Sequence, residues 1–288
     1  AGMVLSRAIV RDTVGASEAA SRMGYITMGM AVVPMIGPMI GGFLDEIYGW
    51  KAAFVLTLAF GVVAIAVVYF DLGETNRRRT SGLAAQFATY PALLKSPLFW
   101  SYSLTAAFTS GAFFAFIGGG PLVATEMLGL APSSYGIYFG IISAGYILGN
   151  FLSGRFSGRV GVNRMTLAGG AIASVGVLIS ICLFALGLFH PLSLFGPALF
   201  LGVGNGITLP NANAGIVSVR PDLAGSASGL GGALQIGGGA LLSVLAGALL
   251  APDSGPYPLL FVMLFSSMAA ILTALFIMRL AQHAGDGR

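Results

Sequence analysis

The sequence contains few side chains that could carry covalent or acid–base chemistry. Its two histidines, His190 and His283, lie outside the apolar segments, and neither can be placed beside a serine nucleophile. The segment GSASG at 225–229 lacks the central serine of a nucleophile elbow, and GVGNG at 202–206 lies inside an apolar segment with no strand before it. Cys182 has no second cysteine to pair with. We therefore assign no catalytic residue, no metal ligand and no cofactor.

Ionisable groups inside the apolar segments are the next candidates, because such groups mark ion pathways in segments that cross a membrane. The ten Asp and Glu residues all lie at or near the ends of apolar segments, so none is placed at mid-depth. Arg7, close to the end of the first apolar run, is the nearest candidate for a functional charge. The alternative for Arg7 is a structural one, in which its guanidinium snorkels to the interface.

Amide and aromatic side chains inside the apolar segments could bind a ligand. Buried amides are costly in hydrocarbon unless they face partners or water, although an amide can also join two helices. Phe residues in such segments also serve lipid contact or packing. A mostly aromatic, weakly polar cavity would suit amphipathic compounds. Our candidate substrate-binding residues are Phe113, Phe116, Tyr146, Asn150, Asn205, Asn211 and Gln235, with Asn205 and Gln235 as the sharpest.

The composition places these residues in a membrane. Of the 288 residues, 56% are apolar and only 8% charged, and the mean hydropathy is +0.90, whereas a soluble domain is about a quarter charged. The sequence pI near 9.4 could indicate a nucleic-acid partner, but the basic residues fall singly or in threes between apolar spans. Membrane orientation explains them better, and we expect no nucleic-acid partner.

The apolar stretches predict eight membrane-spanning helices after an N-terminal stub, each long enough to cross a hydrocarbon core of about 30 Å. The gap at 71–97 is the longest; its basic turn and moderately amphipathic segment predict a cytoplasmic linker with an interfacial helix, or else a long solvated loop. The predicted spans are 23–43, 49–70, 99–122, 134–156, 165–189, 192–219, 225–250 and 258–280.

The gaps between these spans differ sharply in charge. When they are assigned alternately to two sides, thirteen of the fourteen Lys and Arg residues fall on one side, and only Lys51 falls on the other. The positive-inside rule makes the basic side cytoplasmic. A missed or invented helix would destroy this asymmetry, so the pattern supports eight crossings and a cytoplasmic C-terminus.

Two glycine-containing motifs are candidates for conformational contacts. The stretch GYITMGMAVVPMIGPMIGG at 24–42 resembles motif C of major facilitator antiporters, with its GPxxGG core intact; ordinary Gly/Pro packing is the alternative. The stretch GRFSGRVGVNR at 154–164 resembles the second-half copy of motif A, but Gly158 replaces the usual Asp, and a short basic loop is the alternative. The motif residues are Gly24, Gly37, Pro38, Gly41 and Gly42, and then Gly154, Arg159, Gly161 and Arg164.

Further segments extend the resemblance along essentially the whole chain. SRAIVRD at 6–12, GWKAAF at 49–54, GPLVATEMLGLAPSSYG at 120–136 and LPNANAG at 209–215 resemble the Bcr/CflA branch of major facilitator drug exporters. The resemblance implies an all-α fold of two six-helix bundles that lacks helices one to three and most of helix four. It divides the chain into the rest of the N-terminal bundle at 1–70, a linker at 71–97 and a C-terminal six-helix bundle at 98–288.

The same resemblance implies a function. We expect a monomeric transporter in the bacterial inner membrane that exports drugs or other small amphipathic compounds in exchange for protons. Relatives commonly carry the proton-titrating carboxylate in the N-terminal bundle, in the part that is absent here. The alternatives are a major facilitator transporter of one metabolite, such as a sugar or an amino acid, and a passive channel or non-transporting scaffold. More polar groups would be expected in a metabolite site, and GPxxGG argues against that alternative.

Overall fold

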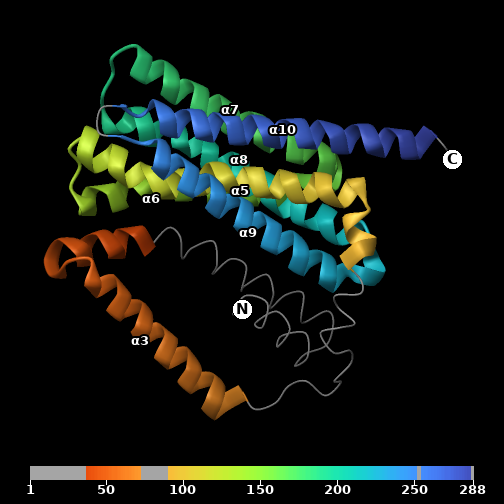
Figure 1. Ribbon diagram of the computed structural model, residues 1–288, viewed down its shortest axis with the longest axis horizontal. Helices are drawn as coiled ribbons and strands as arrows, with labels where there is room; N and C mark the ends of the chain where they lie inside the picture. The colour runs from red at the N-terminus through yellow and green to blue at the C-terminus, as the bar shows by residue number, and fades with distance from the viewer. Residues whose placement is uncertain (1–36, 73–89, 252–253, 287–288) are drawn as a thin grey trace.

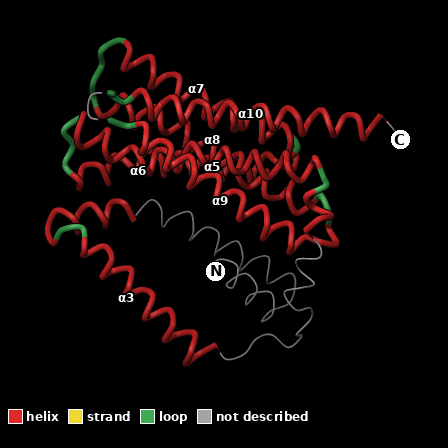
Figure 2. The backbone as a smooth tube through the Cα atoms, viewed as in Figure 1, coloured by secondary structure: helices red, strands yellow, loops and turns green. Residues whose placement is uncertain are grey.

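The computed structural model describes residues 37–72, 90–251 and 254–286, and these ranges consist of helices and short connections without a strand (Figures 1 and 2). Residues 37–48 and 90–94 are also helical. Short π or 3₁₀ turns are η1 (Val68–Leu72), η2 (Val123–Met127) and η3 (Pro221–Leu223). The long helices are α3 (Lys51–Val67), α5 (Pro97–Leu122), α6 (Pro132–Val160), α7 (Val162–Ala185), α8 (Pro191–Ser218), α9 (Ala224–Leu249) and α10 (Tyr257–Asp286).

Seven helices in the described part of the chain are long and apolar enough to cross a membrane, which confirms seven of the eight predicted spans. Most of the other predicted span, 23–43, lies outside the described residues, as do Arg7 and Gly24. The third predicted span ends later than expected, because η2 continues α5 to Met127 despite Pro121 within the helix. The last helix also continues to Asp286, beyond the predicted end at 280.

Helix α8 occupies the centre of the α5–α10 bundle and packs closely on both sides. A Cβ at Gly202 or Gly206 would overlap the backbone of α6 at Ile142 or Tyr146, and a Cβ at Gly204 would overlap that of α7 at Gly169. Small residues let helix backbones approach closely, and this packing attracts helices in lipid, where the hydrophobic effect cannot. Glycines on two faces of α8 therefore hold α6 and α7 against it.

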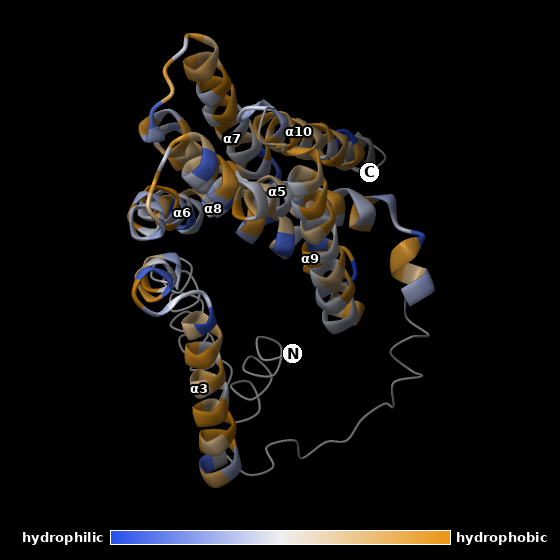
Figure 3. Ribbon diagram, turned by 60° about the vertical axis from the view of Figure 1, so that its left-hand side comes forward, coloured by the Kyte–Doolittle hydropathy of each residue, from blue (hydrophilic) through white to orange (hydrophobic). Residues whose placement is uncertain are grey.

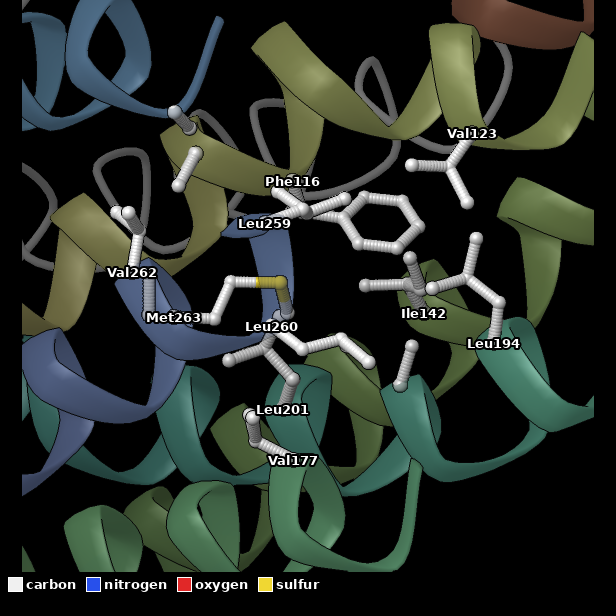
Figure 4. Close-up of a cluster of buried hydrophobic side chains, with 14 of the residues drawn as sticks. Phe116, Val123, Ile142, Val177, Leu194, Leu201, Leu259, Leu260, Val262 and Met263 are labelled. Carbon is white, nitrogen blue, oxygen red and sulfur yellow. The ribbon is translucent and has the colours of Figure 1, made fainter. Parts of the chain in front are cut away.

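Large apolar side chains fill the bundle core at one end. Figure 4 shows Phe116 of α5 among side chains from α6, α7, α8 and α10, including Ile142, Leu201 and Met263. Phe116, Ile142 and Leu201 are each 0% exposed. Dispersion contacts of this kind are individually small, but together they fix the relative positions of the helices.

Helix α3 stands apart from this bundle. In Figures 1 and 3, α7 and α10 lie on the far side of the bundle from α3, whereas α6 and α9 lie on the near side. None of the residues of α3 is buried, and most of its ribbon has the colour of hydrophobic residues (Figure 3). Such a helix is suited to lipid or to further membrane helices.

The predicted linker at 71–97 falls largely on residues 73–89, outside the described part. Its last part is helical at 90–94, where Leu93 is 0% exposed and packs in a cluster with Phe99 and Tyr102 of α5. The segment just before α5 is therefore attached to the C-terminal bundle. The division of the chain at 71–97 stays a prediction.

Candidate functional site

The helix at 37–48 contacts the start of α6 through its backbone. A Cβ at Gly136 of α6 would lie 2.6 Å from the carbonyl oxygen of Pro38 and 2.7 Å from Cα of Met39. A Cβ at Gly42 would overlap the carbonyl oxygen of Pro132 and lie 3.2 Å from Cα of Ser133. At each glycine the nearest partner atom belongs to the backbone and lies closer than 3.0 Å to the added Cβ, so a side chain at either position would force the two helices apart.

This contact places the residues of the predicted GPxxGG motif individually. Pro38 and Gly42 lie in the contact, whereas no atom of the described residues lies within 4 Å of a Cβ added at Gly37 or Gly41. Within the described residues, the motif therefore meets α6 through Pro38 and Gly42. Gly41 and Gly42 are adjacent and point about 100° apart around a helix, which is why only one of them meets α6.

Aromatic side chains from three helices form one cluster beside this end of α6. Phe113 of α5 is 6.1 Å from Phe139 of α6, and Phe116 is 5.7 Å from Phe195 of α8, measured between ring centroids. Tyr138 stacks on Phe195 at 5.3 Å. Phe116 is fully buried in the core, so the expectation that it lines a cavity was wrong for this structure, whereas Phe113 is half-buried.

The two central amides of α8 are both buried. The Asn211 side chain donates from Nδ2 to Oγ of Ser153 at 2.9 Å and to the carbonyl oxygen of Ile207 at 2.8 Å. Asn211 therefore joins α8 to α6, which is the helix-joining alternative rather than cavity lining. Asn205 is 2% exposed, and its Oδ1 has no hydrogen-bond partner among the described residues. A buried amide oxygen without a partner costs stability.

Three other predicted residues are half-buried and remain accessible. Tyr146 and Asn150 lie one turn apart on α6, and Asn150 Nδ2 donates to the Tyr146 carbonyl oxygen at 2.8 Å. Gln235 of α9 donates from Nε2 to Oγ of Ser110 on α5 at 2.9 Å. Gln235 thus links α9 to α5, and its partner Ser110 was missed by sequence reasoning because nothing in the sequence pairs residues so far apart.

The basic connection between α6 and α7 is a single residue. Gly161 ends α6 and begins α7 with φ 92° and ψ 145°, a backbone conformation that only glycine adopts readily. Arg159 lies in the last turn of α6, where a cation interacts favourably with the C-terminal carbonyls. Arg164 follows in the first turn of α7 and is exposed, and no atom in the described part of the chain lies within 4 Å of a Cβ added at Gly154.

Hydrogen bonds between helices near this end were also missed by sequence reasoning. Tyr102 of α5 donates from its hydroxyl to Oδ1 of Asn163 at the start of α7, at 2.6 Å. Thr105 of α5 donates to Thr273 of α10 at 2.8 Å. These residues are common membrane-helix types without a motif, so only the fold brings them together.

Charged groups in the described residues stay near the helix ends. Between α8 and α9, Arg220 donates from Nε and Nη2 to the two carboxylate oxygens of Asp222, at 3.1 Å each. This hydrogen bonding lowers the pKa of the exposed Asp222 carboxyl. The other described acids also lie at or beyond helix ends; they are Asp45, Glu46, Asp71, Glu126 and Asp286. The described residues thus contain no proton-binding carboxylate at mid-depth.

Comparison with known proteins identifies relatives of this chain. The chain is 30% identical over 253 residues to "Uncharacterized MFS-type transporter YdgK" of Bacillus subtilis (strain 168), covering 86% of this chain and 62% of that protein. It is 29% identical over 280 residues to "Bicyclomycin resistance protein homolog" of Haemophilus influenzae, covering 94% and 67%. It is 28% identical over 292 residues to "Multidrug resistance protein D" of Escherichia coli (strain K12), covering 99% and 71%.

These proportions mean that the chain spans 62% and 67% of the lengths of the first two relatives. Among solved structures, the chain is similar to a bacterial homologue of the human lysosomal transporter Spinster, described as inward-facing and occupied. The TM-score is 0.63 at 18% identity, covering 96% of this chain and 73% of that one. This likeness supports the fold alone.

The relatives named for bicyclomycin and multidrug resistance confirm the resemblance to the Bcr/CflA branch that the motifs indicated. The model of one family matches residues 1–242 and, in a second overlapping match, residues 124–287. Together these matches cover nearly all of the chain, which belongs to the Major Facilitator Superfamily.

Proposed function

We propose that the protein exports drugs or other small amphipathic compounds across the bacterial inner membrane in exchange for protons. The observation that carries this proposal is the similarity, over 94% of the chain, to the bicyclomycin resistance protein homologue. The similarity to multidrug resistance protein D extends over 99% of the chain. Two relatives with resistance names favour export of toxic compounds over uptake of one metabolite.

The binding surface that we propose consists of half-buried side chains on three helices of the C-terminal bundle. Phe113 of α5, Tyr146 and Asn150 of α6, and Gln235 of α9 combine aromatic rings with neutral amides. Aromatic and amide groups bind amphipathic molecules of varied shape without selecting one charge. Asn205 and Asn211 support this surface from within α8.

Alternating access requires that the two bundles separate at one end while they remain in contact at the other. The contact of residues 38–42 with α6 supports this mechanism, because glycine on both helices allows an approach that can form and break without side chains interlocking. From this contact, α3 runs away from the bundle (Figure 1). We assign this contact to the outer side of the membrane, on which the charge pattern places Lys51 and none of the other Lys and Arg residues.

The experiment that tests the proposal measures a fluorescent cationic dye in cells that express the natural full-length gene product containing this sequence. We expect lower accumulation than in cells with an empty vector, and we expect a protonophore to abolish the difference. A non-ionophoric inhibitor of ATP synthase serves as the control, because it lowers ATP without collapsing the proton gradient. Equal accumulation across a varied set of dyes and antibiotics would contradict export and favour a narrow metabolite transporter.

A further inference from the structure

A groove of about 380 Å³ runs between α5 and α10. Its walls are formed by Trp100 and Leu104 of α5 and by Leu272 and Phe276 of α10. Leu272 is 64% exposed and Phe276 is 49% exposed, so the groove opens away from the bundle core. In a membrane this opening faces lipid, and the apolar walls suit an acyl chain.

The position of the groove along the bundle follows from the hydrogen bonds between the two helices. Ser266 of α10 donates to the carbonyl oxygen of Phe108 at 2.6 Å, and Thr105 donates to Thr273 at 2.8 Å. The two helices are therefore antiparallel, and the start of α5 lies beside the last turns of α10. The groove, which includes Pro97 and Phe276, is at the end of the bundle that the charge pattern makes cytoplasmic.

Two exposed cations stand at this end of the groove. Arg279 follows Phe276 by three residues and Leu272 by seven, so it continues the same face of α10. Lys95 follows Leu94, whose carbonyl oxygen accepts a hydrogen bond from Trp100 Nε1 at 2.8 Å. That bond keeps the turn carrying Lys95 next to the tryptophan that lines the groove. Neither cation has an ion-pair partner among the described residues.

The start of α5 adds to this positive end. Its N-cap Ser96 already accepts the hydrogen bond from Phe99 N, and Pro97 has no N–H. The helix dipole nevertheless favours an anion at this terminus. Trp100, with its amphipathic ring, is a side chain typical of the headgroup level of a membrane. The cations, the tryptophan and the apolar walls thus follow one another along the groove in the same order as the phosphate, the glycerol and the acyl chain of a phospholipid.

We propose that this groove binds an anionic phospholipid of the cytoplasmic leaflet. One acyl chain lies between α5 and α10, and the phosphate lies between Lys95 and Arg279. The lipid would fasten the start of the C-terminal bundle to its last helix. This site is separate from the proposed transport surface, and its test does not depend on export.

The test is native mass spectrometry of the purified protein in a mild detergent, titrated with phosphatidylglycerol or with phosphatidylcholine of the same acyl chains. We expect tighter binding of phosphatidylglycerol. Near a membrane surface each Lys or Arg contributes about 1 kcal/mol to binding an anionic lipid, so the double variant Lys95→Gln/Arg279→Gln should weaken phosphatidylglycerol binding by about thirtyfold. Phosphatidylcholine binding should change much less.

Two further variants separate the groove from general charge. Leu272→Trp fills the groove without altering the charge of the protein and should weaken the binding of both lipids. Arg155→Gln removes an exposed cation of α6, at the same end of the bundle but on another helix, and should leave the preference for phosphatidylglycerol unchanged. The proposal is overturned if both lipids bind equally well, if the double variant keeps the preference, or if Arg155→Gln reduces it as much as the double variant does.

Discussion

Gly161 fixes the turn between α6 and α7 through its backbone alone. Its φ of 92° with ψ of 145° costs a residue with a side chain about 1–3 kcal/mol. We predict that Gly161→Ala lowers the thermal unfolding temperature of the purified protein. Gly140→Ala, in open space within α6, is the matched control and should leave that temperature unchanged or raise it slightly. Equal effects of the two substitutions would contradict this explanation of Gly161.

Asn205 poses a different question, because its buried Oδ1 lacks a partner in the structure. An unsatisfied buried polar group costs about 1–3 kcal/mol, and an apolar side chain of similar shape removes that cost. We predict that Asn205→Leu keeps or raises the unfolding temperature while it lowers dye export. Export at the normal rate would mean that Asn205 has no role in transport, and a large loss of stability would mean that the Oδ1 has a partner.

The amides illustrate what could be predicted at the scale of residues. Their position inside spans was readable from the sequence, because an amide in an apolar run stands out. Their partners were not, since Ser153 and Ser110 lie on other helices and are ordinary residues there. Consequently Asn211 was predicted to line a cavity, whereas it joins α8 to α6.

At the scale of elements, the contact between residues 37–48 and α6 depends on which glycine faces the partner helix. We predict that Gly42→Ala lowers export at least tenfold, because the added Cβ would overlap the carbonyl oxygen of Pro132. At the adjacent Gly41 no atom of the described residues lies within 4 Å of the new Cβ, so Gly41→Ala should export almost normally. Dye export, corrected for the amount of protein in the membrane, distinguishes the two. Equal activities would contradict a role for this contact.

The spans were predictable because twenty or so apolar residues are needed to cross the hydrocarbon core, and this requirement is visible in the sequence. Their contacts were less predictable. The sequence shows glycine pairs such as Gly202 and Gly206, but it does not show that Gly204 between them meets α7 while they meet α6. Phe113 and Phe116 were predicted as substrate-binding residues, but the cluster that they form with rings such as Phe195 was not predicted, because its members lie on different helices.

For the whole molecule, the charge asymmetry predicts the orientation. We predict that a green fluorescent protein fused after Arg288 fluoresces, because it folds in the cytoplasm but not when exported in an unfolded state. Alkaline phosphatase, which requires an oxidising compartment, should be active when fused in the connection near His190, between α7 and α8. The same phosphatase fused near Gly161 serves as the control and should be inactive. Reversed activities at the two connections would contradict the assigned sides.

Locking the proposed outer contact tests alternating access most directly. In the full-length protein with Cys182→Ala, the pair Met39→Cys and Ser133→Cys lies within one turn of the contact on each helix. A short, reducible thiol cross-linker should join the pair, stop dye export, and allow export again after reduction. Each single cysteine should retain export under the same treatment. Export that continues with the pair fully cross-linked would contradict the account.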